Sequence, residues 1–294
     1  MSEWAVLGVP IDSVGRAGGT ELAPAALRKA GLVKRLGITD RGDVGVHIRG
    51  ETRDPETGIV GSDDVLTMTI TVRSAIRSMV AAGQRPLVLG GCCALVPAAL
   101  AGMRDAAGTI GIASVDGHVD VYDGRTSPTG EGADMPLAVA FGFGPERWVG
   151  AAGGPSATPA ESVVLGARDP EEAVHIAKLL EGELADLLVL SPDDLRAQGL
   201  GESGDLAAKR LAAGTGRFWI HLDVDVLDEA AMPATDDLMP GGLQWEELAE
   251  LLRPLCASPA AAGLSIGCLN PEKDPGGELT QRTSDLVVAA LTPP

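Results

Sequence analysis

The amino-acid sequence predicts an α/β protein, a three-layer αβα sandwich around a mainly parallel sheet. Short aliphatic runs alternate with Ala- and Leu-rich helical stretches from one end of the chain to the other. The runs are apolar at successive positions, which is typical of strands buried on both faces. Parallel strands need crossover helices, and these cover both faces of the sheet. Because no linker or change of composition divides the chain, we expect residues 1–294 to form a single domain.

Strands are expected where β-branched and aliphatic residues run together. In chain order these runs are Trp4–Val9, Asp43–Ile48, Arg85–Leu89, Thr109–Val115, Ser162–Ala167, Leu187–Leu190, Arg217–Leu222 and Gly263–Ile266. Helices are expected where good helix formers place apolar residues three or four positions apart. These stretches are Ala23–Ala30, Asp64–Ala82, Leu95–Arg104, Pro170–Leu180, Asp205–Ala213, Gln244–Cys256 and Glu278–Leu291.

Composition and charge exclude several classes of protein. Hydrophobic residues make up 45% and charged residues 22% of the chain, which suits a packed core. The 41 acidic against 23 basic residues leave a formal net charge of −18, so nucleic-acid binding and docking on an anionic membrane are not expected. The amino terminus has no basic region before its first apolar run, and no apolar run is long enough to cross a bilayer. Four cysteines without zinc-motif spacing favour a reduced, cytoplasmic protein.

The first polar cluster, Asp116-Gly117-His118-Val119-Asp120, follows the strand Thr109–Val115. In an extended segment, the side chains of Asp116, His118 and Asp120 project to one side. Two carboxylates and one imidazole suit Mn²⁺ or another divalent transition metal. The alternative is a solvated loop whose histidine caps a helix.

The second cluster follows the strand Arg217–Leu222, where Asp223 and Asp225 share one face. Two carboxylates at the end of an apolar strand repel each other unless a cation lies between them. His221 has the same parity but lies deeper in the strand, so we interpret it as a supporting histidine rather than a ligand. Asp228 is expected to begin a turn. The two clusters together offer five donors, enough for two ions about 3.5–4 Å apart that share a water.

The third cluster, Gly90-Gly91-Cys92-Cys93, lies between a strand and a helix. A Gly-Gly turn brings backbone close to a site and aims the next side chains at it. Each cysteine could be a buried small hydrophobe, a metal-bound thiolate or, with a base such as His118, a nucleophile. We interpret Cys93 as a metal ligand and Cys92 as a packing residue.

These clusters, in this order, resemble the motifs of the ureohydrolase superfamily of arginase, agmatinase and formiminoglutamase. The resemblance covers nearly the whole chain, and further matching stretches are Val6–Pro10, Asp40–Asp43, Val164–Asp169 and Pro240–Leu243. It implies an arginase-like eight-stranded, mainly parallel sheet, two Mn²⁺ ions and a small-molecule substrate. It also implies a trimer or hexamer, although the sequence leaves a monomer open.

The resemblance also implies a set of metal ligands. Asp116 and Asp223 would bridge the two ions, and the remaining ligands would be Cys93 with Asp120 on one ion and His118 with Asp225 on the other. Cys93 stands where the family has a metal-binding histidine. Because a thiolate is softer than an imidazole, we expect this side to bind Mn²⁺ weakly or to prefer another divalent metal.

Two further departures concern the substrate. Ala133 stands where arginases carry a proton-shuttling histidine, and Cys268 stands where the family has a guanidinium-binding glutamate. A guanidinium would lose a charge-assisted hydrogen bond worth about 1.5–3 kcal/mol. Ordinary arginine or agmatine hydrolysis is therefore not expected, and the substrate-binding candidates are Cys268 and the loop acids Asp123, Glu131 and Asp134.

The sequence thus predicts a metal-dependent hydrolase of a linear C–N bond of the amidine, N-hydroxyguanidine or formimino type. Metal-bound hydroxide would attack the carbon, with His118 and Asp120 as catalytic residues and Asp120 relaying the proton. One alternative is a non-catalytic binding protein of arginase fold that has lost one or both metals. Another is a thiol hydrolase that uses Cys93 or Cys268, which leaves the clustered aspartates unexplained.

Overall fold

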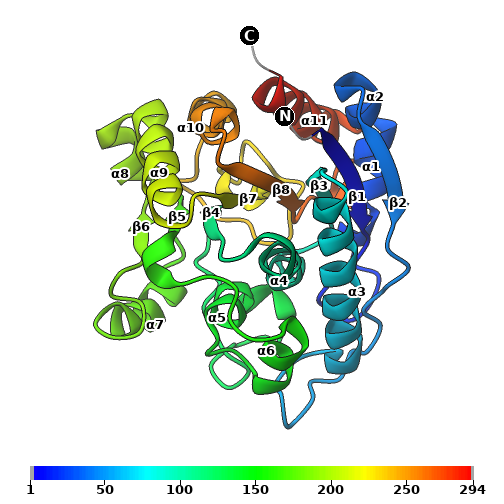
Figure 1. Cartoon of the computed structure of the whole chain (residues 1–294), viewed down its shortest axis with the longest axis vertical. Helices are drawn as coiled ribbons and strands as arrows, with labels where there is room; N and C mark the ends of the chain where they lie inside the picture. Colours follow the sequence, from blue (N-terminus) through cyan, green and yellow to red (C-terminus); the bar gives the residue numbers. More distant parts are fainter. Residues whose placement is uncertain (1–2, 293–294) are drawn as a thin grey trace.

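The computed structural model describes residues 3–292, and within them eight strands form one sheet in the order β2-β1-β3-β8-β7-β4-β5-β6 (Figure 1). Every pair of neighbouring strands is parallel. The strands are β1 (Trp4–Val9), β2 (Thr39–Asp43), β3 (Arg85–Gly90), β4 (Gly111–Val115), β5 (Ser162–Leu165), β6 (Leu188–Leu190), β7 (Phe218–Asp223) and β8 (Ala261–Gly267). The predicted fold class is confirmed, and the sheet is wholly rather than mainly parallel.

Two apolar layers cover the sheet. One layer packs on α3 (Ser62–Ala81), α4 (Val96–Ala107), α5 (Pro136–Phe141), α6 (Glu146–Ala152) and α7 (Pro170–Leu180). The other packs on α1 (Ala23–Lys29), α2 (Leu32–Leu36), α8 (Pro192–Gln198), α9 (Leu200–Thr215), α10 (Trp245–Ala257) and α11 (Glu278–Leu291). In Figure 1, α10 and α11 lie on one side of the strands, and α4, α5 and α6 lie on the other. Each strand is buried from both sides because its successive side chains enter opposite layers.

The predicted strand at Asp43–Ile48 is wrong in its position. The structure places β2 at Thr39–Asp43, an exposed edge strand that pairs with β1. Val44, Val46 and Ile48 are buried, but they lie in irregular backbone after the strand. Alternating apolar residues indicate that one side of a segment is buried, but they do not show that its backbone pairs with a neighbouring strand.

The long helices lie where the sequence predicts them, and α7 and α11 have the predicted bounds. The helices α2, α5, α6 and α8 were not predicted, because five to seven residues give too short a window for helical periodicity. Within residues 3–292, each helix is either too short or too polar to span a bilayer.

Strand order positions the site. β8 and β7 lie between β3 and β4, although they come much later in the chain. Ligands of open α/β sheets bind beyond the carboxyl ends of the strands, where the strand order reverses. The loops after these four strands therefore converge at one edge, and they carry the polar clusters at Cys93, Asp116–Asp120, Asp223–Asp225 and Cys268.

Candidate metal centre

The loop after β4 folds tightly around its own carboxylates. Asp116 is fully buried, and its Oδ1 accepts a hydrogen bond from the His118 backbone N–H at 2.8 Å. Asp120 has a φ of 58°, in the left-handed region that non-glycine residues rarely adopt. Such strained backbone concentrates at functional sites, where surrounding contacts hold it. Here the Asp120 carbonyl accepts from Leu137 N–H at 3.0 Å.

The loop after β7 presents two more buried carboxylates. The Asp225 N–H donates to Asp223 Oδ1 at 2.8 Å, which orients the Asp223 carboxylate at the start of a 3-10 turn that contains Asp225. The β4 loop meets Asp225 directly, because Gly117 N–H lies 3.0 Å from Asp225 Oδ1 and His118 Nδ1 lies 2.9 Å from Asp225 Oδ2. The two aspartate clusters therefore form one site.

Cys93 lies on the other side of the same carboxylates. Its Sγ is 2.6 Å from Asp223 Oδ2, 3.2 Å from His221 Nε2 and 3.5 Å from Cys268 Sγ. Cys92 is buried in the apolar layer that contains α3 and α4, as its predicted packing role requires. Burial raises the pKa of the Cys92 thiol to about 12.

The buried acids of this site shift one another's pKa values. Burial, and then the neighbouring carboxylates, raise the pKa of Asp116 and Asp120 well above the ordinary range and that of Asp223 to about 7. Burial opposes the charge on His118, but the carboxylates of Asp225, Asp116 and Asp120 together outweigh it and raise the pKa of the imidazole to about 12. The thiol of Cys268, followed by burial, raises the pKa of Cys93. Such a cluster favours protons or metal cations.

Two groups of donor atoms could each hold a metal ion. One consists of Asp116, His118 and Asp120, and the other of Cys93, Asp116, His221 and Asp223. Within each group the ligand atoms lie within 4.8 Å of one another, and Asp116 belongs to both. We interpreted His221 as a supporting histidine, but the structure places its Nε2 among the donors. The carboxylate, imidazole and thiol groups suit divalent transition metals.

A small pocket of about 140 Å³ opens onto these donors. Cys93, His118, Asp120, Asp223, Asp225 and Cys268 line it, together with Ala133 and the loop acid Asp134. Asp134 is held in place by Thr129 Oγ1, which donates to its Oδ2 at 2.7 Å. Of the four predicted substrate-binding residues, Cys268 and Asp134 therefore face the metal donors.

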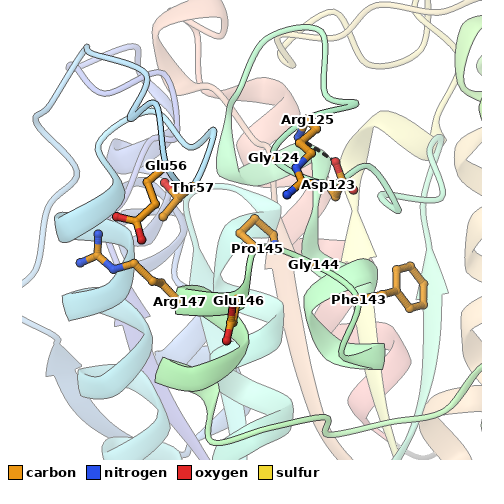
Figure 2. A pocket seen from close by; sticks show the side chains of 10 residues that line it. All are labelled: Glu56, Thr57, Asp123, Gly124, Arg125, Phe143, Gly144, Pro145, Glu146 and Arg147. Atoms are coloured by element: carbon orange, nitrogen blue, oxygen red, sulfur yellow. Dashed lines mark hydrogen bonds between the residues drawn. The ribbon is translucent and has the colours of Figure 1, made fainter.

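The other two substrate-binding candidates lie outside this pocket. Asp123 lines a separate cavity of about 420 Å³ with Glu56 and Arg147, and Figure 2 shows its side chain turned toward Arg125. Its Oδ1 accepts from the Arg125 N–H at 2.7 Å, which makes it a turn residue. Glu131 lies 3.3 Å from Ser13 Oγ, and burial raises its pKa to about 7.

Sequence reasoning missed three residues that support or line the site. Glu172, in the first turn of α7, is buried and accepts from the Val119 N–H. Arg168 donates to backbone carbonyls after β7, and Asp237 lines the pocket. Arg168 directly follows the predicted strand Ser162–Ala167, and this position at a strand end could have marked it as a residue of the site. Glu172 and Asp237 lie among ordinary surface-type acids of a helix and a loop, so local sequence offers no signal for them.

Comparison with known proteins identifies the family of this chain. The model of the arginase family matches residues 2–292. An arginase of Brevibacillus brevis is 30% identical over 251 residues, which cover 82% of this chain and 82% of that protein. The solved arginase of Bacillus caldovelox superposes with a TM-score of 0.91 at 24% identity, covering 100% of this chain and 99% of that one. The formimidoylglutamase of Bacillus subtilis gives 0.79 at 19% identity, covering 99% and 86%. The chain belongs to the arginase family, and it is thus a ureohydrolase-type metallohydrolase that acts on linear C–N bonds.

Proposed function

We propose that this protein hydrolyses an amidine-type carbon, such as an N-hydroxyguanidine or a formimino group, with two divalent ions. The supporting observation is that Asp116 and Asp223, which come from different strands, bring ligand atoms within 4.8 Å of each other. Mn²⁺ suits the group of Asp116, His118 and Asp120, because carboxylate oxygens dominate it. When bound, a pair of such ions lowers the pKa of a shared water and polarises the substrate.

The protein's own groups handle the proton and position the reactants. The buried carboxylate of Asp120 faces the pocket beside the other metal donors, where it could accept a proton from the attacking water. His118 is held by Asp225 at 2.9 Å, so its imidazole keeps a fixed orientation at the pocket wall. Because Ala133 carries no titratable group, the leaving amine takes its proton from water or from an acid of the pocket wall such as Asp134 or Asp237.

The pocket also bears on substrate choice. Cys268 lies at the donor end and offers no carboxylate to a guanidinium, which argues for a less basic reacting group. The same pocket is lined by Asp134, Asp169 and Glu171, whose negative charges would bind a cationic handle distant from the reacting carbon. We therefore expect a substrate that combines a weakly basic C–N group with an ammonium.

A product-based screen tests this function. The Mn²⁺-loaded protein is incubated with arginine, agmatine, N-hydroxyarginine and formiminoglutamate, and the release of urea, hydroxyurea, formamide and ammonia is measured. We expect turnover of N-hydroxyarginine, which carries an ammonium beside its less basic N-hydroxyguanidine, to exceed that of arginine and agmatine. Formiminoglutamate, which has carboxylates and no free ammonium, tests the formimino group without the cationic handle. Asp223→Asn should abolish it, and Asp123→Asn, in the separate cavity, should retain it. Full activity after complete metal removal, or failure of the metal-replete protein on the whole panel, would contradict the proposal.

A further inference from the structure

Two thiols from distant parts of the chain meet at one corner of the site. Cys93 follows β3 and Cys268 follows β8, and their sulfur atoms lie 3.5 Å apart. The two loops are tied together, because the Cys268 N–H donates to the Gly91 carbonyl at 2.6 Å. Cys268 has a φ of 62°, a left-handed conformation that is unfavourable for a residue with a side chain. This strained backbone places its thiol in the pocket beside Cys93.

The separation of the sulfur atoms matches a metal dithiolate. A disulfide brings its sulfur atoms to about 2.05 Å. Two thiolates bound to one zinc ion at about 2.3 Å with tetrahedral angles lie roughly 3.8 Å apart. The observed 3.5 Å is close to the second value, so an ion could bind both sulfur atoms with little movement of either loop.

Two further donors lie beside Cys93, and both belong with it to one group of candidate metal ligands. His221 Nε2 lies 3.2 Å and Asp223 Oδ2 lies 2.6 Å from Cys93 Sγ. The other ring nitrogen of His221 lies 2.8 Å from Ser265 Oγ. Metal-binding histidines usually donate from their second nitrogen to a fixed acceptor, and the buried Ser265 hydroxyl provides one. His221 is itself buried in β7, so its ring has little freedom to leave this position.

We propose that Cys93, Cys268, His221 and Asp223 form a thiophilic metal site that prefers Zn²⁺. Two sulfur, one nitrogen and one oxygen donor make a set typical of four-coordinate zinc. The other group of donors, Asp116, His118 and Asp120, offers mainly carboxylate oxygen and suits Mn²⁺. The centre therefore holds two different metals. This grouping places Asp120 with His118, whereas the family resemblance implies that Asp120 binds the same ion as Cys93. This inference rests on the metal-binding part of the proposed function, and it assigns Cys268 to the metal rather than to the substrate.

Thiolate-to-metal charge transfer tests the assignment on the full-length, freshly reduced protein. Cd²⁺ is titrated in as a zinc substitute, and the ultraviolet charge-transfer band is measured per bound ion. We expect the wild-type band to have the intensity of two thiolates, and Cys268→Ser or Cys93→Ser to halve it. Cys256→Ser is the matched control, because Cys256 is also a free, buried cysteine but lies in α10 within the other apolar layer. It should leave the band unchanged.

Two measurements on the wild type do not depend on how the variants fold. When one equivalent of Zn²⁺ per chain is added to the metal-free protein in excess Mn²⁺, elemental analysis after desalting should find that one zinc retained per chain. X-ray absorption at the zinc edge should then show two sulfur neighbours at about 2.3 Å. Removing a group that only supports a metal ligand commonly weakens metal affinity by about 10- to 100-fold. Because Cys268 is proposed as a ligand itself, the preference of folded Cys268→Ser for Zn²⁺ over Mn²⁺ should fall by at least about tenfold.

A single sulfur neighbour, an unchanged band in Cys268→Ser or a Cys93–Cys268 disulfide in freshly reduced protein would overturn the inference. Its failure is distinguishable from failure of the proposed function. If the Mn²⁺-loaded wild type hydrolyses a panel compound while cadmium shows one thiolate, the function stands and the zinc site falls. If the two-thiolate band is present but no panel compound is hydrolysed, the zinc site stands and the function falls.

Discussion

Glu172 Oε2 accepts a hydrogen bond from the backbone N–H of Val119 at 2.6 Å. Its other oxygen, Oε1, lies 3.4 Å from the Val121 N–H. Both N–H groups flank Asp120, whose left-handed backbone needs such support. The first turn of α7 therefore holds the loop that carries three of the proposed metal donors, although Glu172 itself lies 53 residues after Val119.

We expect Glu172→Ala to destabilise the protein and to weaken metal binding. Two buried N–H groups would lose their acceptor, and each unsatisfied donor costs about 1–3 kcal/mol. Loss of a supporting group commonly weakens metal affinity by about 10- to 100-fold. Denaturant unfolding and Mn²⁺ titration measure the two effects. Glu172→Gln, which keeps one carbonyl acceptor, should lose less of both, and equal losses in the two variants would argue against this role.

Arg168 supports the Asp225 side of the site in a similar way. Its Nη2 lies 2.7 Å from the Asp225 carbonyl and 3.0 Å from that of Leu227. Hydrogen bonds from a charged group contribute about 1.5–3 kcal/mol, so Arg168→Ala should lower the free energy of unfolding by about that amount. Lysine cannot reproduce the planar fork, so Arg168→Lys should recover only part of the loss. Arg253→Ala, on the exposed face of α10, is the control and should change stability little.

Gly91 should not tolerate a side chain. A Cβ at this position would lie 1.7 Å from the Ile11 carbonyl oxygen, so either the segment after β1 or the turn after β3 would have to move. Overpacking of this kind costs about 1–3 kcal/mol or more, and here it would also displace Cys93. The Tm in thermal unfolding and the metal content should both be lower in Gly91→Ala than in the wild type. By contrast, a Cβ at Gly150 in α6 meets no heavy atom within 4 Å, and Gly150→Ala should stabilise by about 0.5–1 kcal/mol. The reverse order of stability would contradict the packing argument.

Glu131 should make stability depend on pH. Burial, and then the charge of Asp134, raise its pKa from the ordinary 4.5 to about 7. Between these values the folded protein binds more protons at Glu131 than the unfolded chain does, so stability falls as pH rises through this window. Glu131→Gln removes the titrating group, and its Tm should decline less than that of the wild type between about pH 4.5 and 7. Parallel Tm curves for the two proteins would show that Glu131 does not titrate as described.

Local sequence predicted most strands and the candidate metal donors, because each is marked by a pattern only a few residues long. Apolar runs such as those of β1, β3 and β7 report burial on both faces, and the polar residues after them report the edge where ligands bind. Asp116, His118, Asp223 and Asp225 could therefore be proposed as donors from spacing alone. The same reasoning misplaced β2, since hydrogen bonding at a sheet edge leaves little trace in the pattern of apolar residues.

The amino-acid sequence by itself determined the class of fold, most strands and long helices, and the residue types available at the strand ends. Only the tertiary structure decided which strand ends meet. The order β3-β8-β7-β4 brings Cys268 to Cys93 across 175 residues of chain and places His221 beside Cys93. It also delivers Glu172 to the Asp120 loop. The physical reason is that periodicity and spacing are local quantities, whereas strand order and side-chain contacts arise from packing the whole chain around one sheet.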